Sequence, residues 1–259
     1  MKYEIFGDIK SDCIILALPP LGERKEFYIP LATNLNRFKW ILCDLPGHNN
    51  NTNYTSINEY VDALERLIVQ LGINKIHLVG SSIGAIIIQL FYRKYKKNVK
   101  SLFLLDGGYY FLGDRNLAVE KMKLEKIRDY NDIIEAVHKF TYSIDELRNN
   151  NYKQFEDYFI QNYIKVNDYY KHHCDVQTYN MLSEEVIKTN YCLRESIEEP
   201  IYLILAENNI DDYKRKKIKD FCLIHPTATV KVIENGHHYL SLVNTKQIKE
   251  CLEKYLRYK

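Results

Sequence analysis

The sequence has 259 residues, 46% of them hydrophobic, enough to bury the core of one sizeable domain. Its net charge of +2 gives no reason to expect a nucleic acid or an anionic membrane as a partner. No apolar run has the length of a signal-peptide core or a membrane span, and six scattered cysteines form no C-x-x-C pair, so we expect a reduced cytoplasmic protein without disulfides or zinc.

Short apolar runs alternate with longer helical patterns in the first part of the chain. Residues 13–18 form a continuous apolar run that predicts a strand covered on both faces, and Pro19-Pro20-Leu21-Gly22 ends it. A helical stretch over residues 27–35 follows. The next predicted strand, residues 40–43, stops at Asp44-Leu45-Pro46-Gly47-His48.

The following segment predicts a helix and two further strands. Ser56 and Glu59 have the spacing of a capping box, and Gly72 closes the helix. Apolar residues recur between them at helical spacing: Val61, Leu64, Leu67, Ile68 and Leu71. Strands are predicted over residues 76–79 and 99–105, with a helix between them. Strands joined by helical crossovers predict a mostly parallel sheet with helices on both faces.

The alternation breaks over residues 109–199. This stretch is mostly helical in pattern, rich in tyrosine, asparagine and charge, and has no strand-type apolar run. Strand patterns resume at residues 200–206 and 230–233, and a closing amphipathic helix carries Ile248, Cys251, Leu252, Tyr255 and Leu256. We therefore expect a core of residues 1–108 and 200–259 that carries an inserted helical cap, 109–199.

A serine between two glycines follows the third of these strands. The stretch Gly80-Ser81-Ser82-Ile83-Gly84 has the pattern G-x-S-x-G, in which a strand turns sharply into a helix. Such a turn exposes its central side chain beside the positive end of the helix, which makes Ser82 a candidate nucleophile. The alternative is an ordinary turn whose serine only caps the helix.

Three loops together resemble the α/β-hydrolase family, in the version with a helical cap after the strand that the family counts as its sixth. Leu18-Pro19-Pro20-Leu21-Gly22 stands where the family has apolar-His-Gly-x-Gly, Asp44 to His48 matches its D-x-P-G-H turn, and Gly80 to Gly84 matches its nucleophile elbow. The resemblance covers nearly the whole chain and is weakest across the cap. It implies an α/β fold and a serine hydrolase without a cofactor.

The resemblance also implies roles for individual residues. Ser82 would be the nucleophile, and the backbone N–H groups of Leu21 and Ile83 would hold the oxyanion. Two adjacent histidines compete for the role of base. Gly236-His237 has the family's Gly-His dipeptide, but the register from the preceding strand and from the last helix both favour His238.

The acid that orients the base does not stand at the family's usual position. The family's usual position falls on Asn209, and an asparagine cannot favour an imidazolium. Two aspartates could replace it: Asp106, at the end of the family's sixth strand, and Asp211, in the same loop as Asn209. We favour Asp106 because some relatives, lipases among them, carry their acid there.

These features predict a hydrolase of small or medium-sized carboxylic esters, thioesters or amides that acts through an acyl-enzyme on Ser82. The partner would be a small molecule, with no nucleic acid and no membrane. The alternatives are a ligand-binding protein that has lost turnover and a lyase or cyclase that uses the same site. His172-His173-Cys174-Asp175 suggests a metal cluster, but adjacent histidines on a helix point to different faces. We therefore expect a surface or cleft-lining role and no bound metal.

Overall fold

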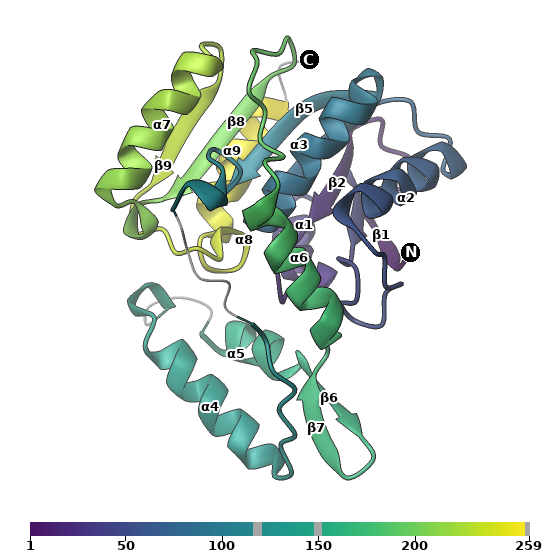
Figure 1. The fold of residues 1–259 in the computed structure, drawn as a ribbon, viewed down its shortest axis with the longest axis vertical. Helices are drawn as coiled ribbons and strands as arrows, with labels where there is room; N and C mark the ends of the chain where they lie inside the picture. Colours follow the sequence, from purple (N-terminus) through teal and green to yellow (C-terminus); the bar gives the residue numbers. More distant parts are fainter. Residues whose placement is uncertain (116–120, 148–151, 257–259) are drawn as a thin grey trace.

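A computed structural model describes residues 1–115, 121–147 and 152–256 (Figure 1). Within these ranges, seven strands form one sheet in the order β1-β3-β2-β4-β5-β8-β9. β1 runs antiparallel to β3, and the other neighbours are parallel. The strands are β1 Tyr3–Gly7, β2 Ile14–Leu18, β3 Lys39–Cys43, β4 Ile76–Ser81, β5 Val99–Leu105, β8 Ile201–Ala206 and β9 Thr229–Ile233. The mostly parallel sheet confirms the predicted fold class.

Helices cover both faces of this sheet (Figure 1). Side chains of α2, α3 and α7 pack on one face, and those of α1 and α9 pack on the other. A 3₁₀ turn, Lys25–Tyr28, precedes α1, and α8 precedes α9. The helices are α1 Ile29–Asn34, α2 Ile57–Gln70, α3 Ile83–Tyr95, α7 Asp212–Ile224, α8 Leu240–Val243 and α9 Thr245–Leu256. No helix in the described ranges is long and apolar enough to cross a bilayer.

Two local features differ from the sequence analysis. The edge strand β1 was not predicted, because its half-exposed residues form no continuous apolar run. Ser56 caps α2 as predicted, with its Oγ accepting the Glu59 N–H at 3.1 Å. The Glu59 carboxylate, however, accepts from the Thr55 N–H at 2.8 Å rather than from Ser56, so the reciprocal half of the box is shifted by one residue.

The chain between β5 and β8 contains α4 Tyr130–Tyr142, α5 Tyr152–Ile160, the hairpin β6 Tyr163–Val166 and β7 Tyr169–His172, and α6 Val176–Lys188. The sequence predicted a mostly helical insertion, and the hairpin within it was not predicted. Asn167, with φ 55°, supplies the left-handed turn residue that joins the two strands. In Figure 1, α4, α5 and the hairpin lie together below the sheet, and α6 leads back toward it. Residues 116–120 and 148–151 of the predicted cap lie outside the described ranges.

A buried polar network joins α5 to the loop after β2. Tyr158 Oη and Asn162 Nδ2 donate to the Glu23 carboxylate at 2.7 and 3.0 Å. Arg24 Nε donates to Asn162 Oδ1 at 2.8 Å, and burial raises the pKa of Glu23. Because each polar group finds a partner, this contact fixes the insertion against the core without an unpaired buried group among these atoms.

Candidate active site

Ser82 occupies a strained turn between β4 and α3. Its φ of 53° and ψ of −116° are unfavourable for a residue with a side chain. A Cβ on Gly84 would lie 2.3 Å from the Leu18 carbonyl oxygen, and one on Gly80 would lie 2.4 Å from Gly84. Both positions therefore require glycine, which explains the spacing of the pattern around the serine.

The loop after β5 packs directly against this turn. A Cβ on Gly107 would lie 2.6 Å from the Ser82 carbonyl oxygen. The buried side chain of Gln89 donates from Nε2 to the Gly108 carbonyl at 2.7 Å and so holds the loop in place. Asp106, at φ 47°, is thereby brought beside Ser82. Asp106 was predicted from the sequence, whereas the supporting contacts of Gly107 and Gln89 were not. The Gly107-Gly108 pair was the available signal for the close packing of the loop.

The structure brings Asp106 and His238 together. Asp106 Oδ2 lies 2.6 Å from His238 Nδ1, and Oδ1 accepts the Ala206 N–H at 3.1 Å. The Asp106 side chain is 2% exposed, whereas that of His238 is 36% exposed. A buried carboxylate at Nδ1 holds the ring by one edge, so that Nε2 is the nitrogen left for proton transfer.

Asn209 lies beside both members of this pair, with its Nδ2 3.4 Å from His238 Nδ1. Its Nδ2 donates to Asp106 Oδ2 at 2.6 Å. Lys214 Nζ donates to Asn209 Oδ1 at 2.6 Å and to the Asn209 carbonyl at 2.7 Å. The usual acid position of the family thus carries a hydrogen-bond donor to Asp106, a connection that the sequence analysis did not foresee.

The competing candidates make other contacts. Asp211 caps α7 by accepting the Lys214 N–H at 2.7 Å, and it forms an ion pair with Arg115 at 3.1 Å. His237 Nδ1 accepts the Tyr239 N–H at 3.2 Å. These contacts assign Asp211 to a helix end and His237 to a turn.

Ser82, Asp106 and His238 line one cavity of about 230 Å³. Leu21 and Ile83, the predicted oxyanion residues, line it too. Ile83 is in the first turn of α3, where backbone N–H groups have no intrahelical acceptor. The apolar wall comes from α3, from the segment after β5 and from α6: Ile86, Tyr109, Tyr110, Leu112, Val186 and Ile187. Within the described ranges Ser82 Oγ makes no hydrogen bond to His238; such bonds often tighten only when a substrate is bound.

Two buried histidines hold the loop that contains Leu21. The Gly22 N–H donates to His48 Nε2 at 2.9 Å, and His173 Nε2 lies 3.0 Å from the Gly22 carbonyl. His48 Nδ1 donates to the Pro46 carbonyl at 2.7 Å, so Nε2 is free to accept only in the neutral ring. Burial lowers the pKa of His48 to about 4, which keeps it neutral near pH 7.

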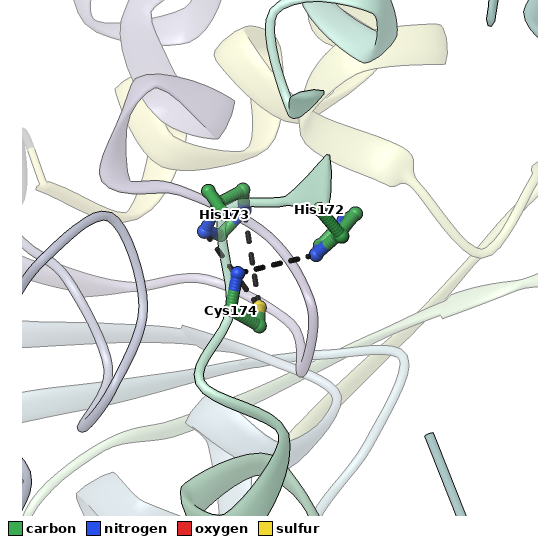
Figure 2. Close-up of side chains that lie close together, drawn as sticks. All are labelled: His172, His173 and Cys174. Atoms are coloured by element: carbon green, nitrogen blue, oxygen red, sulfur yellow. Dashed lines mark hydrogen bonds between the residues drawn. The ribbon is translucent and has the colours of Figure 1, made fainter. Parts of the chain in front are cut away.

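The cluster His172, His173 and Cys174 lies at the end of β7 and just after it, not on a helix as expected (Figure 2). Its three potential ligand atoms lie within 4.8 Å of one another. His173 Nδ1 accepts the Asn49 N–H at 2.9 Å and Nε2 binds Gly22, so this ring could ligate a metal only by losing one of these bonds. Burial also raises the pKa of the Cys174 thiol. These contacts favour a role in bracing the loop after β2.

Comparisons with known proteins agree with this fold. A family model described as "alpha/beta hydrolase fold" matches residues 15–245. Similar solved structures include an E-2-(acetamidomethylene)succinate hydrolase, at 17% identity and a TM-score of 0.79, covering 98% of this chain and 94% of that one. A thioesterase domain from the curacin biosynthetic pathway has 14% identity and a TM-score of 0.72, with 97% and 94% covered.

A lipase-esterase related protein from Clostridium acetobutylicum has 19% identity and a TM-score of 0.66, with 98% of both chains covered. At these identities the likeness shows the fold alone. A search of curated proteins gave no match.

Proposed function

Because the chain belongs to the α/β-hydrolase family, we propose that it is a serine hydrolase that cleaves small carboxylic esters or thioesters. The observation that carries the proposal is the 2.6 Å contact between Asp106 and His238 beside a serine in a strained, glycine-flanked turn. A serine hydroxyl is a weak nucleophile near pH 7 and needs a base with an orienting group, and these residues have the chemistry to supply both.

In the proposed reaction, Ser82 Oγ attacks the acyl carbon while His238 Nε2 removes its proton. The Leu21 and Ile83 N–H groups stabilise the negative charge that develops on the carbonyl oxygen. His238 returns the proton to the leaving alcohol or thiol, and water then hydrolyses the acyl-enzyme in the same way. Asp106 keeps Nδ1 protonated and stabilises the imidazolium in both steps.

The cavity supports a small substrate. Its volume of about 230 Å³ is below the usual range for drug-sized ligands, and its wall is mainly apolar. Part of that wall comes from residues 109–199, which we propose act as a cap that shapes the acyl pocket and excludes water. All six cysteines are free thiols, which supports a reducing, cytoplasmic setting.

The neighbours' names are compatible with this reaction class. One is an E-2-(acetamidomethylene)succinate hydrolase and another is a thioesterase domain. Both share the fold with this chain at low identity, so they support a hydrolase without selecting its substrate.

The proposal is tested by measuring hydrolysis of p-nitrophenyl acetate, butyrate and octanoate by the wild type and by Ser82→Ala. We expect turnover of the short esters and its loss by at least about a thousandfold in Ser82→Ala. Ser81→Ala is the matched control, because the Ser81 hydroxyl contacts Tyr28 at 2.8 Å rather than lining the cavity. An inert wild type, or an active Ser82→Ala protein, would contradict the proposal and favour a ligand-binding role.

A further inference from the structure

The hydrogen bonds at the site continue past Asp106 to a lysine on α7. Lys214 Nζ lies 2.6 Å from Asn209 Oδ1, and Asn209 Nδ2 lies 2.6 Å from Asp106 Oδ2. Asp106 Oδ2 in turn lies 2.6 Å from His238 Nδ1. Four side chains thus form one continuous chain of donors and acceptors, and Lys214, Asn209, Asp106 and His238 all line the cavity of Ser82.

The direction of this chain follows from the charges at its ends. An ammonium group has only donors, so the Asn209 atom that faces Lys214 must be the amide oxygen. The NH₂ group then faces Asp106, whose carboxylate only accepts. The reverse amide orientation would place a donor against the ammonium group and an acceptor against the carboxylate. Lys214 therefore selects the orientation in which Asn209 donates to Asp106.

We propose that Asn209 and Lys214 are positioning residues of the reaction, which hold the Asp106 carboxylate against His238. The inference rests on the proposed hydrolase function. Asn209 at the family's usual acid position then acts as a donor that supports an acid supplied from the end of β5, rather than as an acid that has been lost.

The arrangement accounts for why a carboxylate is unsuitable at position 209. A second carboxylate beside Asp106 Oδ2 would replace a charge-assisted hydrogen bond with repulsion between like charges. The Lys214 ammonium group would pair with only the oxygen that faces it, 2.6 Å away in the present amide, and would leave the other oxygen against Asp106 Oδ2. Asp211 accepts the Lys214 backbone N–H and pairs with Arg115, so these two charges largely satisfy each other.

Asn209→Asp distinguishes a supporting donor at position 209 from a position that could carry the family's usual acid. If Asn209 is a supporting donor, the substitution lowers kcat on p-nitrophenyl acetate at least about tenfold with KM changed less than about threefold. Asn208→Asp is the matched control, because it adds the same charge at an exposed position one residue earlier. Equal or higher activity in Asn209→Asp would overturn the proposal, because position 209 would then accept the family's usual acid.

Lys214→Met tests the lysine end of this series of hydrogen bonds. We expect a similar loss of kcat, partial recovery in Lys214→Arg, and wild-type activity in Lys216→Met on the exposed side of α7. Circular dichroism and thermal melting identify any variant that fails to fold. If the wild type hydrolyses the ester and a folded Lys214→Met protein has the same kcat, the proposed role of Lys214 is overturned. An inert wild type would instead contradict the hydrolase function on which the inference rests.

Discussion

Asp106→Asn removes one negative charge and leaves the surrounding backbone intact. Asp106 has φ 47°, and asparagine tolerates this left-handed conformation better than most other residues. The new amide would meet two donors, His238 Nδ1 and Asn209 Nδ2, each 2.6 Å from the present Oδ2. With its oxygen in the place of Oδ2 it would still accept from both, but its NH₂ group would then face the Ala206 N–H, which Oδ1 now accepts at 3.1 Å. It would also carry no charge to stabilise the imidazolium.

We therefore expect kcat on p-nitrophenyl acetate to fall by roughly three to four orders of magnitude, as when a serine hydrolase loses its orienting acid. Asp211→Asn is the matched control. That carboxylate caps α7 and is half-exposed, so its loss should change kcat less than about threefold. Thermal melting checks that both variants fold. A fall of less than about tenfold in a folded Asp106→Asn protein would refute the assignment of Asp106 as the acid.

Two further predictions concern the loops around the site. Gly107→Ala should destabilise the fold by about 1–3 kcal/mol and abolish turnover, because its Cβ would lie 2.6 Å from the Ser82 carbonyl oxygen. Thermal melting and ester assays measure the two effects. A variant as stable and as active as the wild type would contradict the prediction. Burial lowers the pKa of His48 from 6.5 to about 4, so the unfolded chain binds the extra proton between these values and stability falls as pH decreases from 6.5 to 4. In His48→Gln the glutamine amide can still accept from Gly22 but does not titrate. Its free energy of unfolding in urea should therefore fall less steeply with decreasing pH than that of the wild type, by up to about 1.4 kcal/mol per pH unit. The same pH dependence in both proteins would contradict this prediction.

Much of the fold could be predicted from the sequence because its signals are local. Continuous apolar runs marked the buried parallel strands, and glycines marked the turn at Ser82. The edge strand β1 and the hairpin β6–β7 were missed for a shared reason: each is half-exposed and depends on pairing with another strand. The Asn167-Asp168 turn between tyrosine-rich segments was the available signal for the hairpin.

The site could be predicted only in part. The pattern around Ser82 and the loop register pointed to residues that the structure places around one cavity. The contacts of Asn209 and Lys214 could not be predicted, because they depend on where the start of α7 lies relative to the end of β5. The contacts that hold Gly22 come from His48, 26 positions away, and from His173, 151 positions away, and no local pattern reports such separations.

Reaction with a fluorophosphonate tests the central claim most directly, because the reagent reacts with an activated serine whatever the natural substrate. The folded wild-type protein is treated with the reagent, and the modified peptide is identified by mass spectrometry. We predict a single label on Ser82 that is lost in His238→Ala and retained in His237→Ala. An unlabelled wild-type protein, or a label on Ser82 that persists at the same rate without His238, would contradict the account.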